Sequence, residues 1–286
     1  MYLGIDLGTS SVKVLLIDDA GRTVGEASRA YAVSSPRPGF AESDPADWWT
    51  GTVAAVRACS AGRGDAVKGI GLSGQAHGLV NLGADLQVLR PAILWADQRA
   101  SAEIETVLPL ANPVVGGMGG LSLLWLRTNE PGIYAATRRV LSPKDWLRLR
   151  LTGEVASEPS DASMTLLYDV AGDRWASAFL DAVALDPALL PPLVDSEAVA
   201  GRLTATAAAE LGLAAGTPVA AGLADTAACL FGMGQTKPGA PILQVASGIQ
   251  MMAVVGRVAI REQPFYNTYS GVGRSLSFMA AKQNGG

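Results

Sequence analysis

The first eighteen residues constrain the fold of this chain more than any other stretch. Two runs rich in β-forming residues, 2–5 and 12–17, flank the polar turn Asp6-Leu7-Gly8-Thr9-Ser10-Ser11. Two such runs joined by a glycine-containing turn are typical of a β-hairpin. The sequence therefore predicts a sheet that begins at the N-terminus and carries a polar turn at one end.

The residues of this turn are suited to phosphate binding. Gly8 lets the backbone approach a ligand closely, and the amides and hydroxyls of Thr9 and Ser10 can bind phosphate oxygens. Asp6 supplies hard oxygen ligands that suit Mg²⁺, through bound water. The alternative is an ordinary edge hairpin with a polar turn. The P-loop signature is absent from the sequence.

The composition of the chain limits the kinds of binding partner that are expected. The chain has 286 residues, of which 49% are hydrophobic, and a net charge of −4, which is typical of a globular protein with one or two domains. The acidic balance disfavours nucleic acid, and no apolar run of about 20 residues predicts a membrane span. The two cysteines, Cys59 and Cys229, lie far apart and are expected as reduced thiols, so a cytoplasmic location is expected.

A helix is predicted to begin near residue 45. Asp44 can cap it, and Pro45 suits its first position. Trp49 and Val56 share a face of this helix, which is expected to pack on the sheet. Trp48 is expected to face elsewhere, because neighbours in a helix do not share a face.

A strand predicted over 66–72 leads into polar residues. Open α/β folds place ligand-binding groups at strand ends, and the side chains of Gln75 and His77 can exchange hydrogen bonds with the hydroxyls of a polyol. A core histidine with its hydrogen bonds satisfied is an equal alternative for His77.

A further polar group follows between residues 91 and 99. Asp97 and Arg99 could pair to brace a site, and Trp95 could face a sugar. The alternative is a surface turn whose salt bridge contributes less than about 1 kcal/mol.

Asp225 stands alone in an apolar stretch, after a short predicted strand over 217–222. As a helix cap it would contribute about 1 kcal/mol. As a general base it would accept a proton from a substrate hydroxyl. Both interpretations stay open, and one residue can do both.

Residues 242–255 repeat the pattern of strand, small polar turn and strand. This echo of the N-terminal hairpin suggests two related domains, each offering one phosphate loop across a cleft. The second copy is degraded, because Val245 and Ala246 stand where the first copy has Gly8 and Thr9.

Taken in order, these residues resemble the FGGY carbohydrate kinases, and among them look most like the xylulokinases. The resemblance runs along the whole chain. The motifs occur in the same order as in the family, and this ordered set is more specific than any single motif. The segments that carry it are 2–13, Asp44-Pro45 with Trp48-Trp49, Gly74-Gln75-Ala76-His77-Gly78, 89–95 with Asp97 and Arg99, 143–148, Thr152-Gly153-Glu154, Ser160-Asp161-Ala162 and 222–225.

The resemblance implies an α/β, actin-like ATPase (ribonuclease H-like) fold, with a mixed sheet and flanking helices. Residues 1–237 would form a sugar-binding domain, and 238–286 the start of a nucleotide-binding domain. The implied activity is ATP- and Mg²⁺-dependent phosphorylation of a ketose, in xylulokinases D-xylulose to D-xylulose 5-phosphate. A small-molecule sugar is the expected partner, and a homodimer stays open.

The resemblance also assigns roles to residues. Asp225 falls on the catalytic base, and Asp6 on the acidic residue near Mg²⁺. The sugar-binding candidates are Gln75, Ala76, His77, Trp95, Asp97, Arg99 and Thr226. The nucleotide-binding candidates are Asp6, Gly8, Thr9, Ser10, Lys13 and Ser247.

Departures from the family pattern leave alternatives. Val245-Ala246-Ser247 stands where the family has Gly-Thr-Ser, which should weaken phosphate binding. Ala76 replaces the usual methionine, which should enlarge the sugar pocket. Family members are also longer, so the second domain is expected to be incomplete. The alternatives are a kinase for another ketose or polyol, and a truncated, non-catalytic sugar-binding relative.

Overall fold

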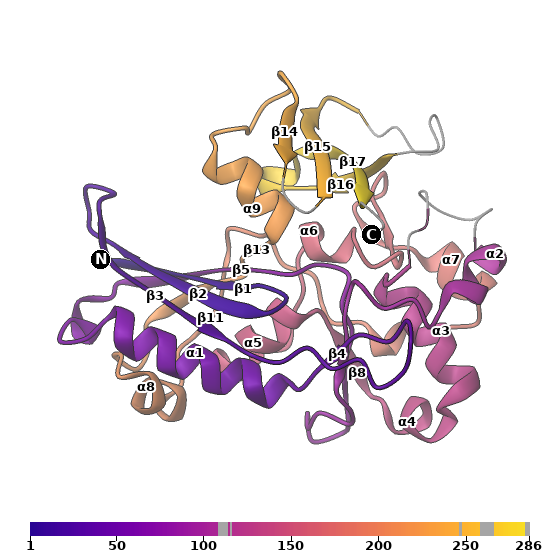
Figure 1. Cartoon of the computed structure of the whole chain (residues 1–286), viewed down its shortest axis with the longest axis horizontal. Coiled ribbons are helices and arrows are strands. Elements are labelled where there is room, and N and C mark those ends of the chain that lie inside the picture. Colours follow the sequence, from indigo (N-terminus) through magenta and orange to yellow (C-terminus); the bar gives the residue numbers. More distant parts are fainter. Residues whose placement is uncertain (108–113, 115, 246–247, 258–265, 284–286) are drawn as a thin grey trace.

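The computed structural model describes residues 1–107, 114, 116–245, 248–257 and 266–283. A large mixed sheet runs through the molecule, with helices on one face and a smaller sheet on the other side (Figure 1). The strand order of the large sheet is β11-β12-β5-β1-β2-β3, with β13 beside β5. Its strands are β1 (Tyr2–Leu7), β2 (Ser11–Ile17), β3 (Thr23–Ala30), β5 (Gly69–Gly74), β11 (Val199–Arg202), β12 (Pro218–Ala220) and β13 (Leu223–Ala224).

The predicted N-terminal hairpin is confirmed. Strands β1 and β2 pair antiparallel, and Asp6 lies opposite Lys13 in their register. Leu3, Ile5 and Leu7 alternate with less buried residues along β1 and are themselves almost fully buried. Because side chains alternate across a strand, this pattern places Asp6 on the face opposite the main core.

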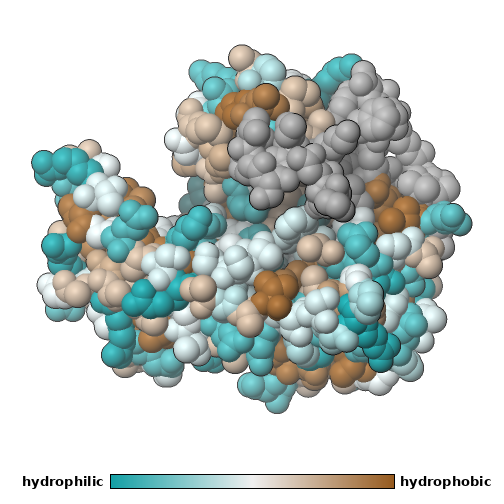
Figure 2. Space-filling model, viewed as in Figure 1, coloured by the Kyte–Doolittle hydropathy of each residue, from teal (hydrophilic) through white to brown (hydrophobic). Residues whose placement is uncertain are grey.

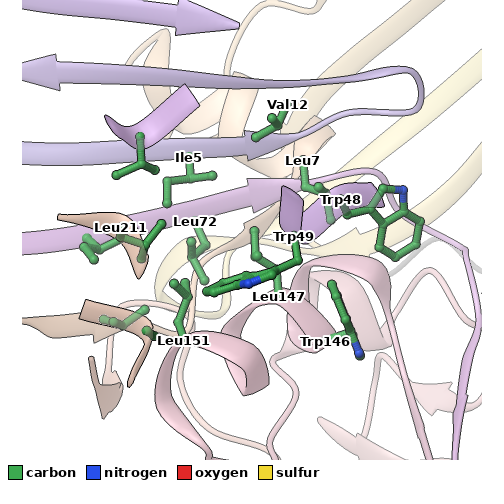
Figure 3. Close-up of a cluster of buried hydrophobic side chains, with 14 of the residues drawn as sticks. Ile5, Leu7, Val12, Trp48, Trp49, Leu72, Trp146, Leu147, Leu151 and Leu211 are labelled. Carbon is green, nitrogen blue, oxygen red and sulfur yellow. The ribbon is translucent and has the colours of Figure 1, made fainter. Parts of the chain in front are cut away.

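Two helices, α1 (Pro45–Cys59) and α5 (Pro143–Thr152), pack on the core face of the large sheet, and α8 (Ala205–Leu211) packs against both of them. The predicted start of α1 is confirmed, since the side chain of Asp44 accepts a hydrogen bond from Ala46 N–H and Pro45 is the first helical residue. Trp49 is buried in the core between sheet and helices (Figure 3).

Trp48 corrects one prediction about this helix. The sequence placed it away from the packed face, yet it is fully buried. Its ring meets Trp146 of α5 edge to face, with the ring centroids 5.8 Å apart. Helix α1 contacts the sheet and also α5 and α8, so neighbouring residues on two of its faces are both buried.

A second apolar core lies beside the large sheet, around α3. This part of the chain contains short strands that pair in separate two-stranded sheets, and helices of four to eleven residues. They are β4 (Glu42–Ser43), β6 (Val80–Leu82), β7 (Ala92–Ile93), α2 (Ile104–Val107), α3 (Gly119–Asn129), α4 (Pro131–Ala136), β8 (Arg139–Leu141), α6 (Pro159–Ala162), β9 (Tyr168–Asp169), β10 (Arg174–Trp175) and α7 (Ser177–Ala182).

Helix α9 (Asp225–Gly232) leads from the large sheet to a second sheet, with the order β14-β15-β17-β16. The strands are β14 (Ile242–Val245), β15 (Gly248–Val255), β16 (Tyr266–Ser270) and β17 (Leu276–Gln283). Strands β14 and β15 form the predicted second hairpin. Ala246 and Ser247, in its turn, lie outside the described residues. The domain boundary between 237 and 238 stays a prediction.

The second sheet rests on the first part of the chain through specific contacts. Tyr269 is buried with Met164 and Ala224. Ser270 N–H donates a hydrogen bond to Ser163 Oγ at 3.1 Å, and Arg274 Nη2 lies 2.6 Å from Asp195 Oδ1. The surface is hollowed between the end of the β2–β3 hairpin and the second sheet (Figure 2). None of the helices in the described residues has the length and apolar character needed to cross a bilayer.

Candidate active site

Three neighbouring parallel strands end at the same edge of the large sheet. Asp6 on β1 is in register with Ser73 on β5, and Ser73 is in register with Leu223 on β13. One residue further along, Ala224 of β13 lies beside the last residue of β5. Asp6 and Asp225 therefore emerge at one edge, on either side of the end of β5.

Asp6 is held by its neighbour on β5. Ser73 Oγ donates a hydrogen bond to Asp6 Oδ1 at 2.5 Å. The adjacent strand β2 places Lys13 opposite Asp6, with an exposed side chain. The second oxygen of Asp6 makes no hydrogen bond to the described residues, so one carboxylate oxygen stays available to a ligand.

Asp225 is the first residue of α9, and Ala224 occupies the cap position. The interpretation of Asp225 as the cap of this helix is therefore wrong, because the cap lies one residue earlier. Its Oδ1 nevertheless accepts a hydrogen bond from Thr226 N–H at 2.6 Å, inside the first turn. The residue reaches solvent.

The pKa of Asp225 is raised from its usual value. Burial by the surrounding protein is the main cause, and the negative charge of Asp6 adds to it, while the hydrogen bonds from Thr226 oppose it. Asp225 thus combines an exposed side chain with protein that surrounds its carboxyl. A raised pKa makes such a carboxylate a better proton acceptor near neutral pH.

Gly222 makes the bend that brings β13 and Asp225 to this edge. Its φ is 88°, and a Cβ at this position would lie 2.4 Å from the carbonyl oxygen of Leu72. We expect Gly222→Ala to lower the free energy of unfolding by about 2–4 kcal/mol, because strain and a backbone clash add together. Urea denaturation measures this change.

Gly216→Ala is the matched control for that change. Gly216 has a φ of 80°, yet a Cβ there would meet no atom within 4 Å. This variant should show only the cost of the backbone conformation, about 1 kcal/mol. Equal losses in the two variants would contradict the close approach of Gly222 to β5.

The turn between β1 and β2 is braced from two sides. The carbonyl oxygen of Gly8 accepts hydrogen bonds from Tyr31 Oη and, at 3.2 Å, from Gln75 Nε2. The pKa of the Tyr31 phenol is raised by burial and by the charge of Asp6. Within the described residues, the main-chain N–H groups of Thr9 and Ser10 have no hydrogen-bond partner, so both are available to an anion.

Trp95 contacts this turn directly. Its Nε1 donates a hydrogen bond to Thr9 Oγ1 at 2.8 Å. The predicted sugar contact of Trp95 and the predicted phosphate contact of Thr9 therefore involve two residues that touch each other. Both roles stay predictions.

Gln75 and His77 follow β5 at the same edge. Gln75 is buried, and its Oε1 has no hydrogen-bond partner in the described part of the chain. His77 Nδ1 lies 2.6 Å from the carbonyl oxygen of Met164, so this nitrogen carries the proton and Nε2 is the acceptor. The ring of Tyr269 meets the imidazole edge to face, with centroids 6.3 Å apart.

His77 should stay neutral well below the usual pH range of histidine. Burial lowers its pKa to about 4, although the Met164 carbonyl favours the charged form. It is the only histidine in the chain, so its ring protons give one NMR titration curve. We expect a midpoint near pH 4 in the folded protein. A midpoint at pH 6 or above would contradict the buried environment.

The same shift predicts a loss of stability in acid. Between about pH 6.5 and 4 the unfolded chain binds a proton at His77 that the folded chain does not, so stability falls as the pH falls through this window. The maximum contribution is roughly 3 kcal/mol. His77→Asn, which tolerates the positive φ of 68°, should show a smaller loss in urea denaturation over this range.

Asp97 and Arg99 form a buried ion pair, as one of the two interpretations of the sequence predicted. Arg99 Nη2 lies 2.8 Å from Asp97 Oδ2 and 2.6 Å from Glu42 Oε1. Asp97 also accepts a hydrogen bond from Ala41 N–H at 2.6 Å, and the Arg99 guanidinium lies 3.9 Å from the centroid of the Phe40 ring. These contacts join the loop after β7 to β4, and the predicted sugar contacts of this pair stay predictions.

Ala76 and Thr226 lie close to the second sheet. Ala76 is buried with Met164 and Tyr269, and Met279 packs against this group. Thr226 Oγ1 lies 4.0 Å from Met279 Sδ. Apolar side chains thus lie against Ala76, where the family pattern has methionine. The effect of Ala76 on the choice of sugar stays a prediction.

Sequence reasoning missed a cluster of buried charges below this edge. It comprises Lys144, Asp145 and Arg148 of α5 with Glu158 and Asp161 near α6, and all five side chains are fully buried. In the sequence, the motifs around 143–148 and 160–162 indicated only the resemblance to the family. The one local signal was the spacing of Asp145 and Arg148, which suits an ion pair within a helix.

The sheet, its strand-end aspartates and its polar turn match a known family. The model of the N-terminal domain of the FGGY family of carbohydrate kinases matches residues 1–232. The chain belongs to this family.

Curated relatives and solved structures agree with that assignment. The xylulose kinase of Escherichia coli K12 is 39% identical over 267 residues, which is 89% of this chain and 54% of the relative. A xyloylose kinase from Brucella ovis superposes with a TM-score of 0.91 at 38% identity, over 98% of this chain and 60% of that structure. The chain therefore spans about half the length of the curated relatives that it matches. The predicted actin-like fold is confirmed.

One further structure bears on the fold alone. A gluconate kinase from Lactobacillus acidophilus superposes with a TM-score of 0.94 at 21% identity, over the whole of this chain and 60% of that structure. Proteins named for different substrates thus share this fold, and the fold does not choose the sugar.

Proposed function

We propose that this chain provides the sugar site and the catalytic base of an ATP-dependent kinase that phosphorylates a ketose, with D-xylulose as the substrate. The observation that carries the proposal is the placement of Asp6 and Asp225 at strand ends on either side of the end of β5, with the pKa of Asp225 raised. The moderate identity to proteins named xylulose kinase supports the choice of sugar.

Asp225 accepts the proton of the sugar hydroxyl as that oxygen attacks the γ-phosphate. The reaction leaves little covalent work to the protein, so positioning and charge stabilisation account for most of the rate. His77 Nε2 accepts a hydrogen bond from a sugar hydroxyl, and Gln75 Oε1 offers a second acceptor. The remaining sugar-site residues are Ala76, Trp95, Asp97, Arg99 and Thr226.

The residues at the turn suit a nucleotide phosphate and Mg²⁺. Proteins bind Mg²⁺ through one or two carboxylates, together with water and substrate phosphates. Asp6 has a carboxylate oxygen available for this, and among the described residues the N–H groups of Thr9 and Ser10, in the turn that follows β1, have no hydrogen-bond partner. Mg²⁺ bound there would neutralise charge on the transferred phosphoryl group. Gly8 and Lys13 belong to the same proposed site, as does Ser247, which lies outside the described residues.

The proposed setting of this reaction is the cytoplasm, where ATP and small sugars are available. Neither nucleic acid nor a membrane surface is a proposed partner, because the chain has a net charge of −4. A homodimer is not needed to bring Asp6 and Asp225 together.

The first experiment measures ADP release by the 286-residue chain with ATP, Mg²⁺ and D-xylulose, with a control that lacks sugar. Calorimetry measures sugar binding in parallel. Sugar-dependent ADP release supports the kinase. Release that does not depend on sugar, together with no sugar binding, contradicts the proposal.

A second candidate function is non-catalytic sugar binding. The sequence of the second hairpin favours it, because Val245 and Ala246 stand where the first hairpin has Gly8 and Thr9. Calorimetry that detects D-xylulose binding and no ATP binding would select this function. A panel of other ketoses and polyols in the same assay tests the choice of sugar.

A further inference from the structure

A short segment, 221–224, carries the chain from β12 to Asp225, and buried side chains hold both its ends. At one end, the carbonyl oxygen of Ala221 accepts hydrogen bonds from Lys144 Nζ at 3.1 Å and Arg148 Nη1 at 3.0 Å. At the other end, Ala224 N–H donates a hydrogen bond to Ser160 Oγ at 2.9 Å. The next residue is Asp225, so these are the last fixed points before the proposed base.

Ser160 is itself fixed in orientation. Its hydroxyl donates to Glu158 Oε1 at 2.7 Å, and its N–H donates to Glu158 Oε2 at 2.9 Å. Ser196 Oγ donates to the second oxygen of Glu158 at 2.5 Å. Because the hydroxyl proton of Ser160 points to Glu158, a lone pair of its oxygen is left for Ala224 N–H.

The two anchors belong to one buried cluster. Lys144 Nζ lies 2.7 Å from Asp145 Oδ1 and 3.1 Å from Asp161 Oδ2, and 3.6 Å from Glu158 Oε1. Arg148 Nη1 lies 2.7 Å from Asp145 Oδ1. The cluster thus joins the side chain that holds Ala224 to the two cations that hold Ala221.

The cluster also lies against the end of β5. A Cβ built on Gly74 would lie 3.1 Å from Lys144 Cβ, so α5 approaches the last residue of this strand closely. In Figure 1, α6 and β13 lie close to the start of α9, and α5 lies on the other side of the sheet. One set of charges therefore supports the strand end that leads to Gln75 and the segment that leads to Asp225.

Stability alone does not account for such a cluster. Removing several charges from water is costly, and well-packed apolar residues of similar size are often as stable or more stable. Buried polar networks can instead fix one geometry, because each hydrogen bond has a preferred direction. Here the hydrogen bonds of the cluster hold the backbone at Ala221 and Ala224, on both sides of Gly222 and just before Asp225.

We propose that Ser160 is a positioning residue for Asp225, and that the buried cluster acts through Ser160 and Ala221 to hold the carboxylate of Asp225 in place beside Asp6. This inference rests on the proposed function, since Asp225 matters to the reaction only as its base. Ser160 touches neither substrate nor reacting atoms in this proposal.

The test uses Ser160→Ala in the 286-residue chain. Carbon NMR of labelled aspartate side chains follows the titration of Asp225, with Asp225→Asn to assign the signal. We expect the midpoint of Asp225 to move by at least half a pH unit, because its burial and its distance from Asp6 both change. A midpoint that matches the unmodified chain overturns the proposal, whether or not the chain turns over sugar.

Turnover supplies the second readout. We expect Ser160→Ala to lower kcat for sugar phosphorylation at least about tenfold, since small displacements of a reacting group are costly, with KM changed less than threefold. Equal changes in kcat and KM would instead indicate a general loss of structure. Ser160→Thr, which keeps the hydroxyl, should restore most of the rate and the Asp225 midpoint.

Ser60→Ala is the matched control, because Ser60 is also buried and donates to a backbone carbonyl, that of Val56, far from the site. Ser60→Ala should change neither the titration midpoint of Asp225 nor kcat. Should Ser160→Ala fail to fold, Ser160→Cys keeps the size of the side chain and weakens its hydrogen bonds. Loss of activity in Ser160→Ala with full activity in Asp225→Asn would refute the proposed function, while the titration still reports on positioning.

Discussion

Replacing Asp225 with asparagine should lower the rate of sugar phosphorylation about 10²–10⁴-fold and leave sugar affinity nearly unchanged, as expected for loss of a general base. Asparagine keeps an oxygen that can accept the hydrogen bond from Thr226 N–H, so the start of α9 should survive. What it loses is the ability to take a proton at the edge of the sheet beside Asp6.

The measurement is kcat for sugar-dependent ADP release in a form of the protein that turns over, with the dissociation constant of D-xylulose from calorimetry. Asp47→Asn, the same change on the exposed surface of α1, is the control and should be silent. A variant of Asp225 within about tenfold of the unmodified rate would exclude the general-base role.

The pH dependence of the rate follows from the same residue. Burial and the charge of Asp6 raise the pKa of Asp225, so the basic form appears only at a pH above the usual range of aspartate. The rate should therefore fall on acidification at a pH above the usual pKa range of aspartate, before an ordinary surface carboxylate is protonated. An acidic limb below pH 3 would argue against this assignment.

The second large effect concerns stability. We expect Asp145→Asn to lower the free energy of unfolding by about 3–5 kcal/mol, because it leaves buried cations without their main counter-charge. Asp145 Oδ1 lies 2.7 Å from both Lys144 Nζ and Arg148 Nη1. Attraction to these two cations lowers the pKa of Asp145 although burial opposes it, so the carboxylate is charged at neutral pH.

Asp161→Asn is the matched control in the same cluster. Burial holds the pKa of Asp161 well above its usual value, although Lys144 Nζ lies only 3.1 Å away. A raised pKa favours the uncharged acid, which an amide resembles, so we expect a smaller change than in Asp145→Asn, within about 1 kcal/mol. Urea denaturation at pH 7 compares the two variants, and equal losses would show that both carboxyls are charged.

The pH dependence of these effects has opposite signs. The contribution of Asp145 is present above the pKa of an unfolded aspartate and is lost as the pH falls through its lowered folded pKa. The protonated Asp161 stabilises most below the unfolded pKa, and this contribution is lost as the pH rises through its raised folded pKa. Asp161→Asn should therefore flatten the decline of stability as the pH rises above the pKa of an unfolded aspartate.

Local pattern was sufficient for several elements. The β1–β2 hairpin follows from two β-forming runs around a glycine turn, and α1 follows from the Asp44 cap and Pro45. The junction of strand and helix at Asp225 was also predicted, although Asp225 proved to be the first helical residue and not the cap. These features depend on residues within a few positions of one another, whose spacing is visible in the chain.

Other features depend on which distant segments meet. Trp48 was expected to face away from the core, and its burial against Trp146 required knowledge of where α5 lies. The hydrogen bond from Trp95 to Thr9 joins two residues that were assigned to different ligands. The buried charges around Lys144 were not foreseen, because isolated Lys, Asp and Glu residues are usually exposed.

The amino-acid sequence by itself thus determined the N-terminal hairpin, the start of α1, the family and the residue types that carry the proposed chemistry. The tertiary structure alone decided that Asp6 and Asp225 share one edge, since that depends on β1 and β13 both lying beside β5. It also decided the direction in which the pKa values of His77 and Asp161 are shifted, because burial controls these shifts and no local pattern reports them. Sheet order and burial arise from contacts between residues far apart in the chain, and the spacing of neighbours does not encode them.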